Sequence, residues 1–145
     1  MKEWKNMGVF NPGLLIDFDC ENFGDPDITV TSGTGFQDLA EITLTVNSPT
    51  NAVWLNAYAT WTGTSAADFI TFRFLRDGVD PLCSAIDSVD QAGQADTTAF
   101  SCCDTTVDAG VHTYTLQASV THPSGGQQQT VTFSMGSFQG AVINT

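Results

Sequence analysis

The stretch Ala52-Val-Trp-Leu-Asn-Ala-Tyr-Ala-Thr-Trp-Thr62 decides the fold, because its side chains alternate in character with a period of two. One set of alternate positions is apolar: Val53, Leu55, Ala57, Ala59 and Trp61. Neighbouring side chains of a β-strand point to opposite faces of a sheet. The stretch therefore predicts a strand that buries this set and presents Trp54 and Tyr58 on its outer face.

The same alternation recurs on both sides of this stretch. It is found at Leu14–Asp19, Ile28–Ser32, Leu39–Val46, Phe69–Arg76, Leu82–Val89, Thr98–Cys103, Gly110–Thr121, Thr130–Met135 and Phe138–Ile143. The pattern assigns Leu75 and Thr115 to outer faces. Helix signals are nearly absent, and Gly, Pro, Asn, Asp and Ser interrupt the pattern about every ten residues. An all-β fold is predicted for residues 13–145, as a single antiparallel sandwich or barrel of eight to ten strands.

The chain is strongly acidic but sparsely charged. It has 4 Lys and Arg residues against 16 Asp and Glu residues, a net charge of −12, while only 14% of its 145 residues are charged. Binding to nucleic acid or to an anionic membrane surface needs Lys and Arg, so the balance argues against both partners. No apolar run approaches the ~18 residues of a membrane-spanning helix. The 41% hydrophobic content indicates a folded domain.

Residues 1–12 do not join the strand pattern. They hold the basic and aromatic residues Lys2, Trp4, Lys5 and Phe10 and end at Pro12. With Glu3 they carry a net charge of +1, against −13 for the rest of the chain. Such an arm suits docking on a neighbouring copy, its charge steering and its rings anchoring, although a frayed terminus would look the same. The arm has no apolar core of a secretory signal, so no signal peptide is expected in this chain.

Four cysteines, Cys20, Cys83, Cys102 and Cys103, allow three complete pairings. None forms a C-x-x-C motif, which argues against a zinc or redox site. Oxidised structural cysteines are the favoured interpretation, and inert reduced thiols are the alternative. Cys102 and Cys103 are adjacent in a strand and so point to opposite faces. Phe100 shares the face of Cys102, which directs that sulfur to the core with Cys83 as its expected partner. Cys103 then points outward, with Cys20 of its own or of a neighbouring chain as the remaining mate.

A longer pattern runs through residues 68–121. One strand ends in Arg76-Asp-Gly, Phe100-Ser-Cys-Cys-Asp-Thr follows, and Ala109-Gly-Val-His-Thr-Tyr-Thr-Leu opens the next strand. The pattern resembles the jelly-roll subunits of spore surfaces, of the endospore-appendage and exosporium-filament type, and it is similar to jelly rolls of phage and virion appendages.

The resemblance implies a jelly-roll sandwich without catalytic activity that assembles with copies of itself outside the cell or on a spore or virion surface. It also implies an anchoring protein on that surface. In the appendage members an N-terminal arm reaches into adjacent subunits, often with cysteines that form disulfides between them. Residues 1–12 have the arm's position but contain no cysteine.

The residues themselves offer no catalytic arrangement. His112 lies on the apolar face of its strand with Tyr114 and Leu116, as a core or sheet-end histidine does, and His122 precedes a proline in a turn. No nucleophile elbow, HExxH motif or phosphate loop occurs. We therefore expect no enzyme.

Asp17, Asp19 and Glu21 form the best metal candidate, with the 1-3-5 spacing of a calcium loop. Asn22 replaces the glycine of the sixth position, and Ile28 replaces the glutamate of the twelfth. In a strand the same spacing places three acids on one solvent-exposed face, which is the interpretation we favour. We expect no cofactor, and a calcium ion shared between subunits is the alternative.

Two functions remain. The first is a structural subunit of an extracellular filament, appendage or coat, joined through the arm, through exposed strand edges and through an outward cysteine. The alternative is a calcium-dependent adhesin or carbohydrate-binding sandwich that uses Trp54 and Tyr58. Those two aromatic residues suit a subunit interface equally well.

Overall fold

Residues 14–123 and 128–144 are described by this computed structural model, and within them nine strands and no helix are found. The strands are β1 (Leu15–Phe23), β2 (Ile28–Thr31), β3 (Gln37–Val46), β4 (Asn51–Gly63), β5 (Phe69–Arg76), β6 (Asp80–Ser88), β7 (Ala95–Asp104), β8 (Gly110–Thr121) and β9 (Thr130–Asn144). None of these described residues belongs to a helix long and apolar enough to cross a membrane.

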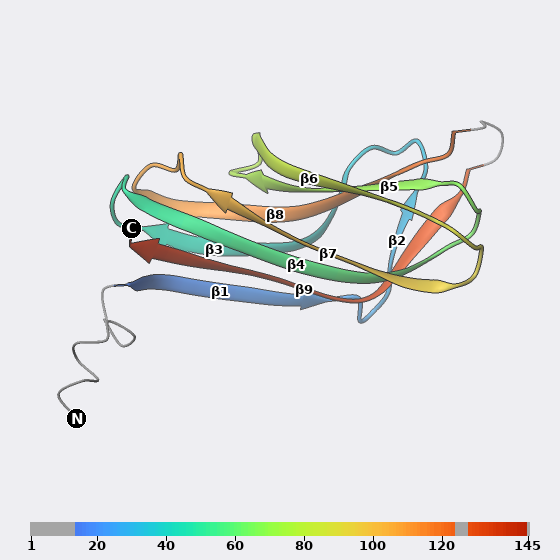
Figure 1. Ribbon diagram of the computed structural model, residues 1–145, viewed down its shortest axis with the longest axis horizontal. Coiled ribbons are helices and arrows are strands. Elements are labelled where there is room, and N and C mark those ends of the chain that lie inside the picture. Colours follow the sequence, from blue (N-terminus) through green and yellow to red (C-terminus); the bar gives the residue numbers. More distant parts are fainter. Residues whose placement is uncertain (1–13, 124–127, 145) are drawn as a thin grey trace, which may run out of the picture.

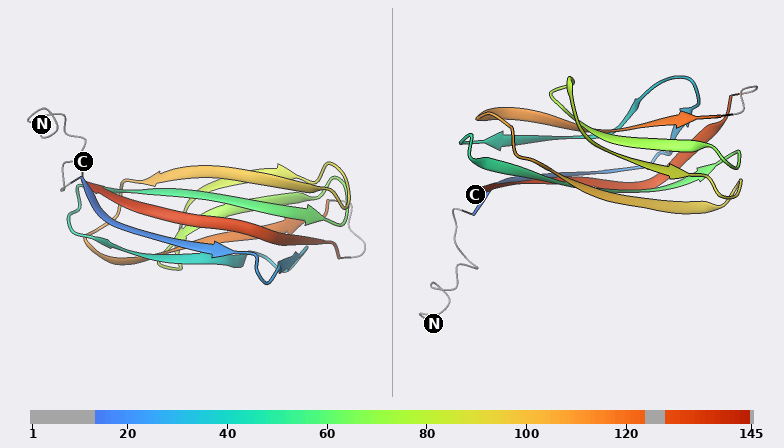
Figure 2. Two further views of the ribbon diagram at one scale, coloured as in Figure 1. Left: turned by 90° about the horizontal axis from the view of Figure 1, so that it is seen from below. Right: turned by 45° about the horizontal axis from the view of Figure 1, so that its top comes forward.

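The strands form two antiparallel sheets stacked as a jelly-roll sandwich (Figures 1 and 2). Sheet A has the order β1-β9-β4-β7, with β2 also paired to β9, and sheet B has the order β3-β8-β5-β6. The chain crosses between the layers repeatedly, so that β1 of sheet A faces β3 of sheet B on one side of the sandwich. On the other side β6 faces β7. The predicted fold class is confirmed.

Several strands are longer than their patterns predicted. The segments Thr130–Met135 and Phe138–Ile143 are parts of one strand, β9, whose pairing with β4 shifts register between Thr60 and Trp61. β1 continues to Phe23, whose ring lies over the backbone of Gly136 on β9, where any side chain would collide with it. A glycine in the neighbouring strand thus leaves room for an aromatic ring.

Aromatic rings join the two layers at the centre of the core. Phe74 of sheet B stacks on Phe100 and on Phe138 of sheet A, with ring centroids 4.4 and 5.2 Å apart. Phe72 meets the edge of Phe133 at 5.9 Å. Such offset and edge-on pairs add to the free energy gained by burying the rings. The apolar positions of β4 that the sequence assigned to the core are all buried.

Two outer-face assignments are wrong. Leu75 is 7% exposed and Thr115 is 5% exposed, although alternation placed both in solvent. They are partners in the β5–β8 register and cover one another. The turn after β5 is also fixed to β8, because the backbone N–H of Asp77 donates to the carbonyl of Thr113 at 2.7 Å. The turn therefore shelters the end of an outer face that the alternation pattern treats as open.

A disulfide joins β6 to β7. It connects Cys83 and Cys102, whose Cα atoms are 6.2 Å apart, and these are the two residues that strand parity paired. Cys102 lies in the core, and its neighbour Cys103 is exposed, as their adjacent positions in the strand require.

We expect the Cys83→Ser/Cys102→Ser variant to lose about 3 kcal/mol of unfolding free energy under oxidising conditions, because the bond closes a loop with a sequence separation of 19. Urea denaturation followed by fluorescence measures this difference. Reductant should lower the urea midpoint of the wild-type protein to that of this variant. The Cys20→Ser/Cys103→Ser variant is the control and should keep the wild-type midpoint under oxidising conditions. Equal midpoints for all three proteins would contradict the assignment.

Candidate functional site

The carboxylates of Asp17 and Asp19 bridge the open edges of the two sheets. Oδ2 of Asp19 accepts the backbone N–H of Thr43 on β3 at 2.9 Å, and Oδ1 accepts the N–H of Cys20 on β1 at 2.9 Å. Asp17 repeats the arrangement. Its carboxylate accepts the backbone N–H of Thr45 on β3 and the backbone N–H of Phe18 on β1, both at 2.8 Å. Each carboxylate thus occupies the place that a neighbouring strand's carbonyl groups would take.

The third acid of the series continues the same row, since the N–H of Glu41 lies 3.4 Å from Oε2 of Glu21. The prediction that these three acids form a solvated face is therefore wrong for Asp17 and Asp19, which are half-buried, whereas Glu21 is exposed. The spacing of two residues does place them on one side of β1, but that side faces the edge of β3. No group of three metal-ligating side chains occurs among the described residues. The expectation that the chain needs no cofactor stays a prediction.

A second carboxylate bridge closes the opposite side of the sandwich, between β6 and β7. Asp87 accepts the N–H of Ser88 at 2.8 Å on its own strand and the hydroxyl of Thr98 at 2.6 Å on β7. The indole N–H of the buried Trp61 donates to the same hydroxyl at 2.9 Å. Together with the Cys83–Cys102 bond, this chain of contacts ties the two edge strands at separate points along their length.

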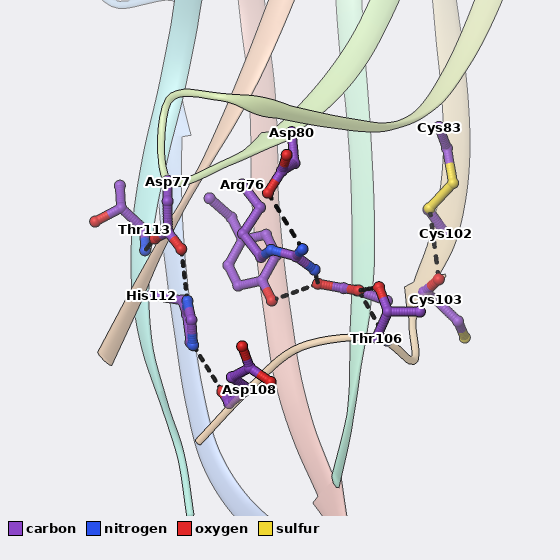
Figure 3. A network of polar contacts seen from close by, with 12 residues as sticks. Arg76, Asp77, Asp80, Cys83, Cys102, Cys103, Thr106, Asp108, His112 and Thr113 are labelled. Atoms are coloured by element: carbon purple, nitrogen blue, oxygen red, sulfur yellow. Dashed lines mark hydrogen bonds and ion pairs between the residues drawn. A yellow bond between two sulfur atoms is a disulfide. The ribbon is translucent and has the colours of Figure 1, made fainter. Parts of the chain in front are cut away.

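A polar network holds one end of the sandwich (Figure 3). Asp104, at the end of β7, is 2% exposed and receives Nη1 of Arg76 at 2.6 Å and the hydroxyl of Tyr114 at 2.8 Å. Its other oxygen accepts the N–H of Thr106 at 3.2 Å. Burial alone would raise the pKa of Asp104, but the hydrogen bonds from these three groups outweigh burial and hold that pKa below its ordinary value. The carboxylate stays charged, and it joins three elements.

His112 links two loops at the same end. Its Nδ1 lies 2.6 Å from Oδ2 of Asp77 in the β5–β6 turn, and its Nε2 lies 2.7 Å from the carbonyl oxygen of Asp108 in the β7–β8 loop. Both partners are acceptors, so both ring nitrogens can donate at once only when the imidazole is protonated. Burial lowers the pKa of His112, but the hydrogen bonds to Asp77 and Asp108 raise it more, and the net direction is upward. The same contact lowers the pKa of Asp77.

The outer face of sheet A presents a regular grid of uncharged side chains. The register sets three rows across β1, β9, β4 and β7: Phe18–Ala141–Trp54–Cys103, Cys20–Gln139–Asn56–Ser101 and Asn22–Ser137–Tyr58–Ala99. We call these twelve residues the neutral face. Trp54 is 52% exposed, Phe18 53% and Tyr58 39%. A shallow hollow of about 160 Å³ lies over Ala141 and Gly140, between Phe18 and Trp54.

Both remaining thiols lie on the neutral face. Cys20 belongs to β1 and Cys103 to β7, the two edge strands of sheet A, and both are exposed and unpaired. β9 and β4 lie between them, which separates their Cα atoms by roughly 14 Å across the strands alone, and the two residues also lie in different rows. A disulfide needs Cα atoms within about 7 Å. Cys20 of the same chain is therefore excluded as the partner of Cys103.

The structure groups some predicted site residues and separates others. Trp54, Tyr58, Cys20 and Cys103 share one face, whereas Asp17, Asp19 and Glu21 lie in the seam between the sheets. The arm residues Lys2, Trp4, Lys5, Phe10 and Pro12 lie outside the described residues. The roles of Asp87, Asp104 and Arg76 could not be predicted from the sequence, because each acts through a partner that is distant along the chain. Asp17, Asp19 and Asp87 do share one local feature that the sequence contains. Each precedes a strand residue and accepts the backbone N–H of that residue.

Comparison with known proteins shows the fold alone. No family model matches the chain, and no curated protein matches its sequence. Among solved structures, T=1 particles derived from infectious bursal virus match with a TM-score of 0.63 at 10% identity. The structure of the Gx strain of infectious bursal disease virus matches with a TM-score of 0.59 at 12% identity. Each alignment covers 90% of this chain, and the chain spans about a third of those viral chains, 33% and 34%.

A sugar-binding protein aligns less closely. The C-terminal domain of EclA reaches a TM-score of 0.43 at 14% identity, over 85% of this chain and 79% of that domain. This likeness is too distant to bear on function. The viral structures place the chain among jelly rolls that include those of virion proteins.

Replacing Asp19 by Asn should lower the unfolding free energy by about 1–3 kcal/mol, because the amide retains one acceptor oxygen for two backbone donors. Hydrogen exchange of the Thr43 and Cys20 amides, followed by NMR, should accelerate. Asp27→Asn, which removes the same charge from an exposed loop, is the matched control and should change neither quantity. Unchanged protection of the Thr43 amide in the Asp19 variant would contradict the bridge.

The loop contact through His112 should weaken as the pH rises. A group with a raised folded-state pKa stabilises fully below its unfolded pKa, about 6.5 for histidine, and loses that contribution as the pH rises through the folded value. NMR titration of the His112 ring should show a midpoint above 6.5, and Asp77→Asn should bring it down toward the ordinary value. A wild-type midpoint at or below the ordinary value would refute the double-donor geometry.

Proposed function

We propose that this chain is a structural subunit that assembles with copies of itself into an extracellular filament, appendage or coat. The observation that carries the proposal is the state of the four cysteines. Two of them form a bond inside the fold, and the other two are exposed on one face where they cannot bond to each other within the chain. In an oxidising environment, which stabilises the first bond, surface thiols of this kind link different chains.

The construction of the sandwich supports a subunit that must last outside a cell. Both sides on which the sheets would be open are tied by side chains, through Asp17 and Asp19 on one side and through Asp87 and a disulfide on the other. Apart from residues 1–12 and the strand residues Arg73 and Arg76, the chain has no Lys or Arg. Proteases that cleave after basic residues would therefore need the sheet to open.

The edges available for joining copies are fewer than the sequence indicated. Strand addition at β3 meets the carboxylates of β1, which already accept the backbone N–H groups of Glu41, Thr43 and Thr45. A strand added there would have to displace these hydrogen bonds. Contacts through the arm, through the outward cysteines and through the neutral face remain parts of the proposal, and so does an anchoring protein on a spore, virion or cell surface.

The adhesin alternative receives less support from the geometry. Its aromatic residues, Trp54 and Tyr58, lie on the outer face of sheet A, whereas the acids proposed for calcium face β3 in the seam. A calcium-dependent sugar site needs the ring platform and the ion beside the same ligand. Trp54 and Tyr58 alone suit stacking on a sugar ring, but they equally suit contact with protein.

Native material, separated on a non-reducing gel, should show covalent oligomers that collapse to the monomer when reductant is added, because Cys20 and Cys103 are exposed. Cys20→Ser/Cys103→Ser should abolish these species and Cys83→Ser/Cys102→Ser should not. Electron microscopy of the wild-type protein should show ordered assemblies, and deletion of residues 1–12 should abolish them. Monodisperse particles of single-chain mass in every salt condition would overturn the proposal.

A further inference from the structure

The neutral face is set apart from the rest of the surface by its lack of charge. None of its twelve residues is charged, although the chain carries −12 and every other side of the described sandwich holds carboxylates. The outer face of sheet B holds Asp38 and Glu41 beside Arg73, and the seam between β1 and β3 holds the row that begins at Asp17. Depletion of charge together with exposed aromatic rings is the composition of a protein–protein interface core.

We propose that the neutral face packs against the same face of a second copy of this chain, around a two-fold axis that runs across the strands along the Cys20–Gln139–Asn56–Ser101 row. The inference deepens the proposed function, and it rests on that proposal only in requiring contact between copies. It specifies that the neutral faces of two copies meet and that a two-fold axis sets their relative orientation.

Charge favours a second copy as the occupant. Two bodies of −12 repel, and contact through any carboxylate-bearing side would set like charges opposite one another. The neutral face is where two copies can approach without that cost. A neutral polysaccharide is the other ligand that suits ring platforms, but its hydroxyl groups are good partners for carboxylates. Binding of sugar therefore gives no reason for excluding Asp and Glu from every row.

The order of residues in the rows makes the face self-complementary. An axis along the central row exchanges the first row with the third, so Trp54 of each copy comes beside Tyr58 of the other. Asn56 and Gln139 lie next to the axis and meet their own counterparts, where two amides can donate to and accept from each other.

The size of the face predicts a weak pair. Four strands at their usual spacing, with three exposed positions along each, give roughly 400 Å² per copy. A standard stable interface takes about 800 Å² from each partner. A pair of isolated chains should therefore be in concentration-dependent exchange, and it becomes permanent only when further contacts between copies act together with it.

The test uses the Cys20→Ser/Cys103→Ser protein, so that covalent linkage plays no part. Sedimentation over a range of concentrations should show monomer–dimer exchange. Asn56→Asp changes a single group at the axis and sets two carboxylates face to face, so it should raise the dissociation constant about tenfold or more. Gln37→Glu, the matched change at an exposed position of β3 on sheet B, should leave the constant within error of the parent. Added salt should partly restore the Asn56 variant.

Each outcome decides the proposal separately from the filament function. A parent protein that stays monomeric at every concentration overturns the pairing, even if wild-type chains still form disulfide-linked assemblies. A dimer that Asn56→Asp leaves intact, or that Gln37→Glu weakens equally, assigns the contact to another surface and also overturns it. Retardation of the monomer in a gel containing hydroxyethyl cellulose, lost with Trp54→Ala, would assign the face to a neutral polysaccharide instead.

Discussion

The structure depends on carboxylates that replace missing strands. A sandwich of two sheets has two open sides, where backbone N–H groups of the edge strands have no partner in their own sheet. Here Asp17 and Asp19 give one oxygen to each sheet along β1 and β3, and Asp87 gives one oxygen to each along β6 and β7. Part of the chain's acidity therefore serves the fold, because these carboxylates link the two sheets that pack on the aromatic core.

The ties divide the surface into regions with different uses. Charged groups gather in the seams and at the end of the sandwich, where Arg76, Asp104 and His112 hold loops to strands. The outer face of sheet A is left flat and uncharged. Side chains at strand edges can reach the other sheet, whereas side chains in the middle of an outer face cannot, and the outer face of sheet B keeps the charged residues Asp38, Glu41 and Arg73. Central positions are therefore free to be selected for contact with other molecules.

The sequence predicted those features that local alternation determines. It gave the class of fold, the buried face of Ala52–Thr62, the exposure of Trp54 and the opposite directions of Cys102 and Cys103. It could not predict features that depend on which strands become neighbours. The 1-3-5 acids looked solvated because nothing near them in sequence reveals β3, about twenty residues away, as the facing edge. Leu75 and Thr115 were placed outside for a related reason, since alternation along β5 does not reveal that the turn after this strand is held against the neighbouring strand β8.

The first and last strands are neighbours, and β9 lies between β1 and β4 (Figure 1). The N–H of Asn144 donates to the carbonyl of Leu14 at 2.8 Å, so the beginning and the end of the sandwich touch. The strand pairings of sheet A therefore do not depend on the point in the sandwich at which the chain begins and ends. A circular permutant, joined by a short linker between these two residues and opened at an exposed turn such as Gly78, would contain the same ladders and seams. Anything fused to either end of the sandwich would leave it from the same corner.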